Sequence, residues 1–436
     1  MKKKLVSVLL VAAMTVSMLA GCGAKSDSEK GSSASADGDV TITYWGWDSN
    51  YYEPMFAAYE KEHPNVHFEP TAVEWGDMLT KAQQALASGS DLPVMFGMDN
   101  TLIENWKAMD ICEDLTKYDF DDSKYLDSLA EKCKTDDGKI IGVQESINPA
   151  GIAYKRDLAK EYFGTDDPAE LQAMFASYDD YAAKGSEVYD KSNGEVHLFH
   201  SGQAVAEWLY FASDVANMDG DTLTYTDKMT DVLSKLVTLR DANAVDTYQS
   251  GTPEANATYA DDKHIFYPCP NWALTYYIQG NDPDGSGNWG LLRAPVDYNH
   301  GGAALGISSS ATDEQKQAAY DFAVWATAGD GATIARDDVG YITPYLDLMN
   351  DPHWVSMSED MIAWFGGQDI GEVYYQEIAP NMAGVPSTAW DNTIVNVRND
   401  LSQQLMDDTA MTLDAAIKLG DDQIKQLVTD DSVTVK

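Results

Sequence analysis

The chain has 436 residues, of which 44% are hydrophobic and 11% aromatic, so it can build the cores of two or three domains. It carries 29 Lys and Arg against 71 Asp and Glu, which gives a formal charge of −42. Because no basic excess is present to neutralise phosphates, this composition excludes nucleic-acid binding and flat docking on an anionic lipid surface.

The N-terminus has the arrangement of an export signal. Met1-Lys2-Lys3-Lys4 precedes an apolar run of about fifteen residues, which is shorter than the roughly twenty residues of a membrane span. The run ends in Leu19-Ala20-Gly21-Cys22, which resembles the lipobox of bacterial lipoproteins, where cleavage leaves a cysteine that carries lipid. We therefore expect a signal peptide at residues 1–21, then the lipidated Cys22 and a flexible tether through residue 39. An ordinary secretion signal with a chance cysteine is the alternative.

Strands and helices alternate after the tether. Alternating apolar residues predict strands, and apolar residues at helical spacing predict helices. The predicted order is strand 40–45, helix 52–59 ended by Pro64, strand 66–73, helix 75–87, strand 92–98 and helix 101–106. This β-α-β-α-β-α order predicts an α/β fold with a parallel sheet and right-handed crossovers.

The turns that follow these three strands carry aromatic and acidic side chains. Ligands of open α/β sheets bind beyond the carboxyl ends of the strands, so these turns predict a binding site. The residues concerned are Trp45, Trp47 and Asp48 after the first strand, Glu74 and Trp75 after the second, and Asp99 and Asn100 after the third.

The rest of the chain reads as mainly helical, with a few short strands. Strands are predicted at 140–143, 291–296 and 303–308, a mostly helical pattern from 157 to 279, and helices at 315–327, 391–406 and 413–428.

The cysteines and histidines offer little further chemistry. Cys112 and Cys133 either form a disulfide or join Cys269 as three buried thiols, and both readings stay open. Neither His197-x-x-His200 nor the loop 282–288 has the further ligands that zinc or calcium needs. Since the sequence also lacks a P-loop and a dinucleotide fingerprint after a strand, we predict no metal and no cofactor.

The order and spacing of several segments resemble one protein family. These segments are the lipobox, the tether, Thr43-Tyr44-Trp45-Gly46-Trp47, residues 142–157, Asn271-Trp272-Ala273, Gly301-Gly302 and Gly340-Tyr341-Ile342-Thr343-Pro344. Over essentially the whole mature chain they resemble a carbohydrate-binding lipoprotein of a bacterial ABC importer, among the family 1, maltose-binding-like extracellular solute-binding proteins.

This resemblance implies a two-lobed periplasmic-binding-protein-like fold, with the ligand cleft between the lobes and a hinge of crossing strands. Residues 40–146 with 293–345 would form lobe 1, and residues 147–292 with 346–436 would form lobe 2. The chain would cross between them near 146–148, near 292–293 and after Pro344.

The resemblance also implies sugar contacts from both lobes, since aromatic rings pack on the C–H faces of a pyranose and carboxylates accept from its hydroxyls. The expected ligand-binding residues are Trp45, Trp47, Asp48, Glu74, Trp75, Asp99, Asn100, Glu145, Trp208, Asn271, Trp272, Tyr341 and Trp390, with no catalytic residue. Gly301 and Gly302 would let the backbone approach the ligand. Structural readings stay open for Trp45 against a helix, Trp208 in a core and Asp99 as a helix cap.

The expected function is a lipid-anchored extracellular receptor at the outer face of the cytoplasmic membrane. It would bind a mono- or oligosaccharide as a monomer, without catalysis, and deliver it to the permease subunits of an ABC importer. One alternative is a binder of a cationic solute such as a polyamine, because aromatic rings and carboxylates also hold ammonium groups. A less favoured alternative is a secreted glycoside hydrolase that uses two of the acids.

Overall fold

Two larger β-sheets and one small sheet organise the part of the chain that this computed structural model describes, residues 38–382, 387–430 and 432–436. The strands are β1 (Val40–Gly46), β2 (Val66–Ala72), β3 (Met95–Asp99), β4 (Gly142–Gln144), β5 (Pro149–Lys155), β6 (Met218–Asp219), β7 (Thr222–Leu223), β8 (Phe266–Pro270), β9 (Trp289–Leu292), β10 (Tyr298–Asn299), β11 (Ala303–Ile307) and β12 (Thr434–Val435).

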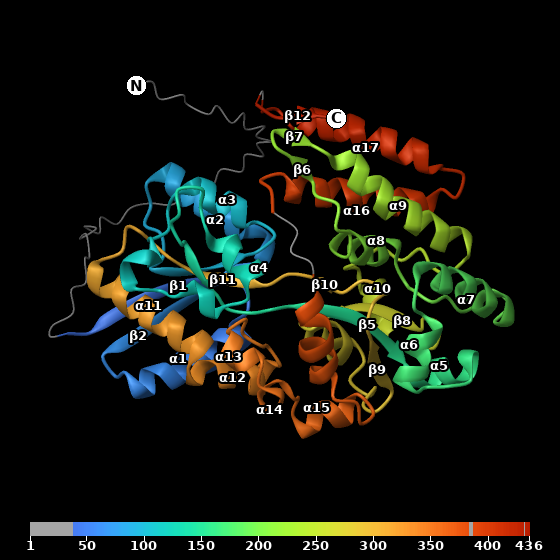
Figure 1. The fold of residues 1–436 in the computed structure, drawn as a ribbon, viewed down its shortest axis with the longest axis horizontal. Coiled ribbons are helices and arrows are strands. Elements are labelled where there is room, and N and C mark those ends of the chain that lie inside the picture. Colours follow the sequence, from blue (N-terminus) through green and yellow to red (C-terminus); the bar gives the residue numbers. More distant parts are fainter. Residues whose placement is uncertain (1–37, 383–386, 431) are drawn as a thin grey trace, which may run out of the picture. The chain divides into compact units, whose positions relative to one another are not determined.

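Helices surround these sheets (Figure 1). The α-helices are α1 (Ser49–Glu62), α2 (Met78–Ser88), α3 (Ile103–Met109), α4 (Asp127–Ala130), α5 (Arg156–Phe163), α6 (Pro168–Met174), α7 (Tyr178–Lys191), α8 (Gly202–Phe211), α9 (Tyr225–Asp241), α10 (Pro253–Ala257), α11 (Asp313–Ala328), α12 (Asp330–Val339), α13 (Leu346–Met349), α14 (Pro352–Val355), α15 (Glu359–Trp364), α16 (Asp391–Asp407) and α17 (Leu413–Leu427). Two π-helices are η6 (Leu274–Gln279) and η7 (Glu372–Ile378). No helix within the described ranges combines the length and apolar character that crossing a membrane requires.

The first sheet has the strand order β2-β1-β3-β11-β4, and β1 pairs in parallel with β2 and β3. Helix α1 connects β1 to β2, and α2 connects β2 to β3, so the predicted alternation of strands and helices is confirmed. Strand β11 is antiparallel to both β3 and β4, which inserts a late part of the chain into this sheet. The carboxyl ends of the three parallel strands meet at one edge, where a site is expected.

The second sheet is built around β5, which pairs antiparallel with β8 on one side and with β9 and β10 on the other. The prediction of a mostly helical pattern across residues 157–279 misses β8. The sequence of β8, Phe-Tyr-Pro-Cys-Pro, contains Pro268 and Pro270. Proline cannot donate a hydrogen bond to a sheet, so this sequence does not predict a strand.

The chain crosses between the sheets at residues 145–148, from β4 to β5, and at residues 300–302, from β10 to β11. The expected second crossing near Arg293 is wrong, because Tyr298 and Asn299 still pair with β5. A third segment lies beside the first crossing, where Ile147 and Ile342 form an isolated antiparallel bridge.

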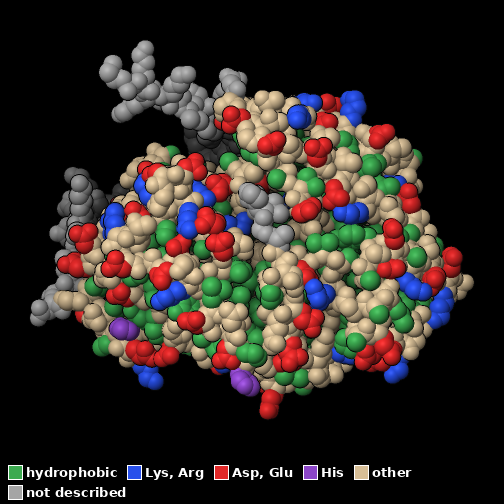
Figure 2. Space-filling view, viewed as in Figure 1, with side chains coloured by type: hydrophobic (Ala, Val, Ile, Leu, Met, Phe, Trp, Pro, Cys, Tyr) green, Lys and Arg blue, Asp and Glu red, His purple; other side chains and the backbone are tan. Residues whose placement is uncertain are grey.

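Strand β5 separates two cores. Ile152 and Tyr154 belong to a core with α7, α8, α9, α16 and α17, whereas Ala153 belongs to a core with η6, η7 and α14. All seven residues of β5 are buried, which explains why its sequence lacks polar alternation. The first sheet has its own core, closed by α1, α3 and α11. On the face shown in Figure 2, Asp and Glu side chains are scattered with Lys and Arg between them.

The three cysteines of the described residues are free and buried, so the disulfide reading is not supported. The Cys112 thiol lies 3.8 Å from the sulfur of Met98, and the Cys133 thiol accepts a hydrogen bond from Gln144 at 3.2 Å. Cys269 lies near the end of β8, in the core that contains Ala153, η6 and η7.

Candidate ligand-binding site

Two turns at the carboxyl edge of the first sheet meet through a hydrogen bond. Trp75 follows β2, and its Nε1 donates to Oδ2 of Asp99, the last residue of β3, over 2.9 Å. The Trp75 side chain is 45% exposed, which is a large apolar surface for one tryptophan. The structure thus brings the second and third turns together, as the sequence predicts.

Asp48 and Asp99 are fixed by local hydrogen bonds. Asp48 caps α1, because its side chain accepts from the backbone N–H of Tyr51 at 3.2 Å. Asp99 accepts from the backbone N–H of Thr101 at 2.7 Å and from the Thr101 hydroxyl. Burial raises the pKa of Asp99, although the bonds from Thr101 and Trp75 oppose this rise. Each carboxylate has about four lone-pair sites, so capping leaves capacity for ligand hydroxyls.

Glu145 stands in the first crossing and is buried. Its Oε2 accepts a 2.6 Å hydrogen bond from the Tyr52 hydroxyl. Burial, with the charges of Asp48 and Asp99, raises the pKa of Glu145 to about 8, even though the Tyr52 bond lowers it. Glu145 therefore carries a proton at neutral pH and can both donate to and accept from a ligand.

The second crossing approaches the first sheet closely through two glycines. Asn100 and Gln144 exchange two amide hydrogen bonds of 3.0 Å. Gly302 has φ +93°, and a Cβ there would lie 2.8 Å from Nδ2 of Asn100 and 3.1 Å from the carbonyl of Ser146. A Cβ on Gly301 would likewise lie 3.3 Å from Nε1 of Trp272. The glycines thus allow the second crossing to pack closely against Asn100 and Trp272, and their expected close approach to a ligand stays a prediction.

Aromatic and charged groups from the second lobe surround His300. Its ring stacks on Phe211 with centroids 4.2 Å apart, and its carbonyl accepts from Nε1 of Trp272 at 2.9 Å. Oε1 of Glu207 lies 3.6 Å from Nε2 of His300 and 3.5 Å from Nη2 of Arg398. Burial lowers the pKa of His300, while Glu207 opposes the effect. The Glu207 side chain is 39% exposed.

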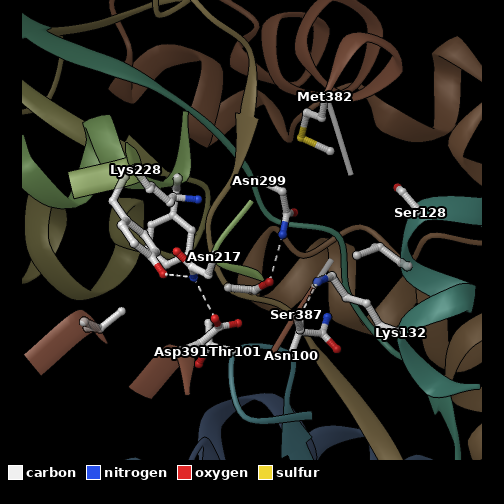
Figure 3. A pocket seen from close by; sticks show the side chains of 15 residues that line it. Asn100, Thr101, Ser128, Lys132, Asn217, Lys228, Asn299, Met382, Ser387 and Asp391 are labelled. Carbon is white, nitrogen blue, oxygen red and sulfur yellow. Dashed lines mark hydrogen bonds between the residues drawn. The ribbon is translucent and has the colours of Figure 1, made fainter. Parts of the chain in front are cut away.

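A pocket lies between the two lobes where the third turn faces α8, α9 and α16 (Figure 3). Its cavity volume is about 100 Å³, which corresponds to roughly three waters at their volume in the liquid. The described lining residues are Asn100, Thr101, Ser128, Leu129, Lys132, Tyr210, Phe211, Asn217, Lys228, Asn299, Gly301, Met382, Ser387, Asp391 and Val395.

Contacts bridge the lobes at two places. Nζ of Lys132 donates to Oγ of Ser387 over 2.7 Å beside the pocket. The Tyr276 hydroxyl, on η6, interacts with Asp48 and Tyr341, and burial together with Asp48 raises its pKa. The Tyr276 side chain is 44% exposed. A ligand that enters between the lobes therefore meets groups from both of them.

A family model of bacterial extracellular solute-binding proteins matches residues 54–362. The chain belongs to this family. A comparison with curated protein sequences gives no match.

The fold of this solute-binding protein is shared by solved structures of low sequence identity. A family 1 extracellular solute-binding protein has a TM-score of 0.78 at 22% identity, over 89% of this chain and 99% of its own. The galacto-N-biose/lacto-N-biose I-binding protein of Bifidobacterium longum, in complex with lacto-N-biose, has a TM-score of 0.73 at 16% identity, over 92% and 100%. An ABC substrate-binding protein of Listeria monocytogenes, in complex with cycloalternan, has a TM-score of 0.68 at 20% identity, over 89% and 99%. The predicted two-lobed α/β fold is therefore confirmed.

Two of the expected ligand-binding tryptophans pack within their own lobes in this solute-binding protein. Trp208 is completely buried in the core of the second lobe, where it packs against Tyr181 and Phe199. Trp45 is covered by α2, whose Lys81 ammonium lies 4.4 Å from the ring centroid. The expectation for Trp208 is wrong, because its ring is enclosed in the core of its own lobe. Trp45 is half-buried, so its ligand contact stays a prediction.

Three further expected residues are buried or half-buried. Asn271 is 1% exposed and donates to the carbonyl of Ile147, so it fixes the first crossing. Trp47 packs over Gly97 of β3, where a Cβ would lie 3.0 Å from the ring. Trp390 precedes α16 and packs against the core of the second lobe.

The remaining expected residues surround the cleft. Glu74 is exposed in the turn before Trp75, and Tyr341 lies 5.3 Å from the ring of Tyr51 near Asp48. Sequence reasoning missed Glu207, Phe211, His300, Lys132 and Lys228. For His300, its position directly before Gly301-Gly302 was the available signal, whereas the lysines had none.

Proposed function

We propose that this solute-binding protein is a lipid-anchored extracellular receptor for a sugar, and that it delivers the sugar to the permease of an ABC importer. The observation that carries the proposal is the hydrogen-bonded pair of exposed Trp75 and Asp99, together with the buried carboxyl group of Glu145 in the crossing. An aromatic face beside hydroxyl-binding carboxyl groups is the chemistry that a pyranose requires.

Structural relatives support the sugar class. Structures with the same fold were solved with lacto-N-biose, with cycloalternan and with maltose. Since all of them are below 25% identical to this chain, they support the class of ligand and leave its identity open. A receptor of this kind closes its lobes on the solute and needs no catalytic group.

The anchor and the delivery step are part of the proposal. Cys22 and the signal sequence lie outside the described residues, so the lipobox sequence alone supports them. A Cys22→Ala variant, expressed in a Gram-positive host, should appear in the medium and lose incorporation of a labelled fatty acid. Retention of this variant in the membrane would contradict the anchor.

Binding is tested with the full-length protein in detergent. Tryptophan fluorescence and calorimetry would follow titration with oligosaccharides and, in parallel, with spermidine and choline. We expect saturable binding of a sugar, which Trp75→Ala weakens at least tenfold. Leu86→Ala is the matched control, because Leu86 is 43% exposed on α2 in the same lobe.

The rival functions predict different outcomes in the same experiment. A response to spermidine alone would establish a receptor for cations and overturn the sugar proposal. Loss of an added glycan over time, checked by chromatography, would instead indicate a glycoside hydrolase.

A further inference from the structure

The pocket between the lobes contains two lysines in a protein of strongly negative charge. Lys132 comes from the first lobe and Lys228 from α9 of the second (Figure 3). The chain as a whole has a net charge of −42, so two ammonium groups in one small cavity are unusual here. The two ammonium groups therefore point to a ligand group that can bind them.

Lys228 is 3% exposed, yet its amine has no hydrogen bond or ion pair with any described residue. Its Nζ lies 4.3 Å from the ring centroid of Tyr210, a contact that leaves its three donors without acceptors. Burial lowers the pKa of Lys228 to about 8, with Asp391 opposing the effect. The charged groups that act on the amine are Asp391, Arg398, Asp231 and Asp214.

The carboxylates near Lys228 are already engaged. Asp391 accepts from Nδ2 of Asn217 at 2.7 Å and from the hydroxyl and N–H of Thr388 at 2.6 and 2.8 Å. Asp231 accepts from Lys235 at 2.8 Å, on the same helix. Neither is therefore a dedicated partner for the Lys228 amine.

The lining consequently has an excess of positive charge. Among the described lining residues, Lys132 and Lys228 are accompanied by one carboxylate, that of Asp391, while Glu104 and Asp99 act on Lys132 from outside the lining. Lys132 donates to the neutral hydroxyl of Ser387. A neutral ligand that closed this pocket would leave two ammonium groups in the lining with the single counter-charge of Asp391, which is costly.

We propose that the sugar bound here is acidic, and that the carboxylate of a hexuronic acid unit binds Lys228 and Lys132. This inference rests on the proposed sugar-binding function and names its substrate class. The neutral hydroxyls lie toward Asp99 and Glu145, because the negative charges of Asp48 and Asp99 disfavour an anion at that end.

Calorimetry on the full-length protein in detergent tests this inference with matched pairs of sugars. The pairs are glucose and glucuronate, galactose and galacturonate, and the corresponding disaccharides. We expect at least one uronate to bind tenfold or more tightly than its neutral partner. Glucose 6-phosphate and glucose 6-sulfate serve as further arms, and tighter binding of either would overturn the carboxylate assignment.

Variants separate a ligand role for Lys228 from a structural one. Lys228→Met should weaken uronate binding at least tenfold and change binding of the neutral partner less than twofold. It should also raise the unfolding temperature, because it removes a buried charge without a partner. Lys235→Met, on the same helix but paired with Asp231, is the control that leaves both affinities unchanged.

The possible results distinguish the acidic-sugar inference from the proposed receptor function. Binding of neutral sugars alone, or equal losses for both classes in Lys228→Met, overturns the acidic-sugar inference and leaves the receptor proposal standing. Absence of binding for both classes overturns both. If Lys228→Met unfolds, Lys132→Gln provides the same comparison from the other lobe.

Discussion

Glu145 is a single side chain whose protonation links the cleft to stability. Its folded pKa of about 8 lies above the unfolded value, so its contribution to stability is present at low pH and is lost as the pH rises toward 8. Glu145→Gln should therefore match the wild type near pH 4 and be more stable at pH 8 by about 3–5 kcal/mol. Urea unfolding at both pH values measures this difference.

The control for Glu145 is the exposed Glu53 on α1. Glu53→Gln should leave the difference between pH 4 and pH 8 unchanged. Identical pH dependence in Glu145→Gln and the wild type would contradict a raised pKa for this carboxyl group.

His264 gives the same kind of dependence through a different contact. It is completely buried, with Nδ1 2.9 Å from Asp261 and Nε2 3.1 Å from Asp246. Burial lowers the pKa of His264, but the two carboxylates outweigh burial and raise it. The stabilisation is thus present below about pH 6.5 and is lost as the pH rises through the folded pKa.

His264→Gln should consequently cost about 2–4 kcal/mol at pH 5 and less at pH 9, measured by thermal or urea unfolding. His67→Gln, at an exposed position of β2, is the comparison that should cost little at either pH. A loss that is the same at both pH values would indicate a packing role instead.

Residues show the limit of sequence reasoning most clearly. The residue types predicted for the cleft are present, but the sequence could not separate Trp75 from Trp208. One ring is 45% exposed at a turn and the other completely buried on α8, and the difference depends on partners distant in sequence. The burial of Lys228 could not be predicted for the same reason, because a lysine in a helical pattern is expected to be exposed.

At the level of elements, the approach of the second crossing to the first sheet depends on Gly302. Gly302→Ala adds a Cβ 2.8 Å from Asn100 to a backbone at φ +93°. We expect a loss of about 2–4 kcal/mol, because the contact and the backbone strain act together. Chemical denaturation provides the measurement.

Gly89→Ala measures the cost of backbone strain without a steric contact. Gly89 follows α2 at φ +68°, and no atom lies within 4 Å of the Cβ that alanine would add. The substitution should cost about 1 kcal/mol. Equal losses at Gly302 and Gly89 would show that the contact with Asn100 is unimportant.

Elements with regular patterns were predictable. Strand β1, helix α1 and strand β2 follow from alternation and spacing, and α16 and α17 begin and end within one residue of the expected positions. The prolines of β8 and the two-residue pairing of β10 gave no periodic signal. Strands β8 and β10 were therefore not predicted, and both belong to the second sheet, where each pairs with β5.

The whole molecule carries acidic side chains over its surface, with 71 Asp and Glu against 29 Lys and Arg. Self-repulsion of such a surface destabilises the folded state, and salt screens it. Raising NaCl from 10 to 500 mM should increase the unfolding temperature by about 1–3 °C. KCl at equal ionic strength should act equally, and a decrease with both salts would contradict a repulsive surface.

The buried, free state of Cys112, Cys133 and Cys269 has a practical consequence. Burial raises the pKa of each thiol, so none reacts readily with maleimide dyes. Cysteines introduced at exposed Leu86 and Ala183, one in each lobe, would take a donor and an acceptor fluorophore without interference from these thiols. Energy transfer between the two dyes could then report lobe closure in real time.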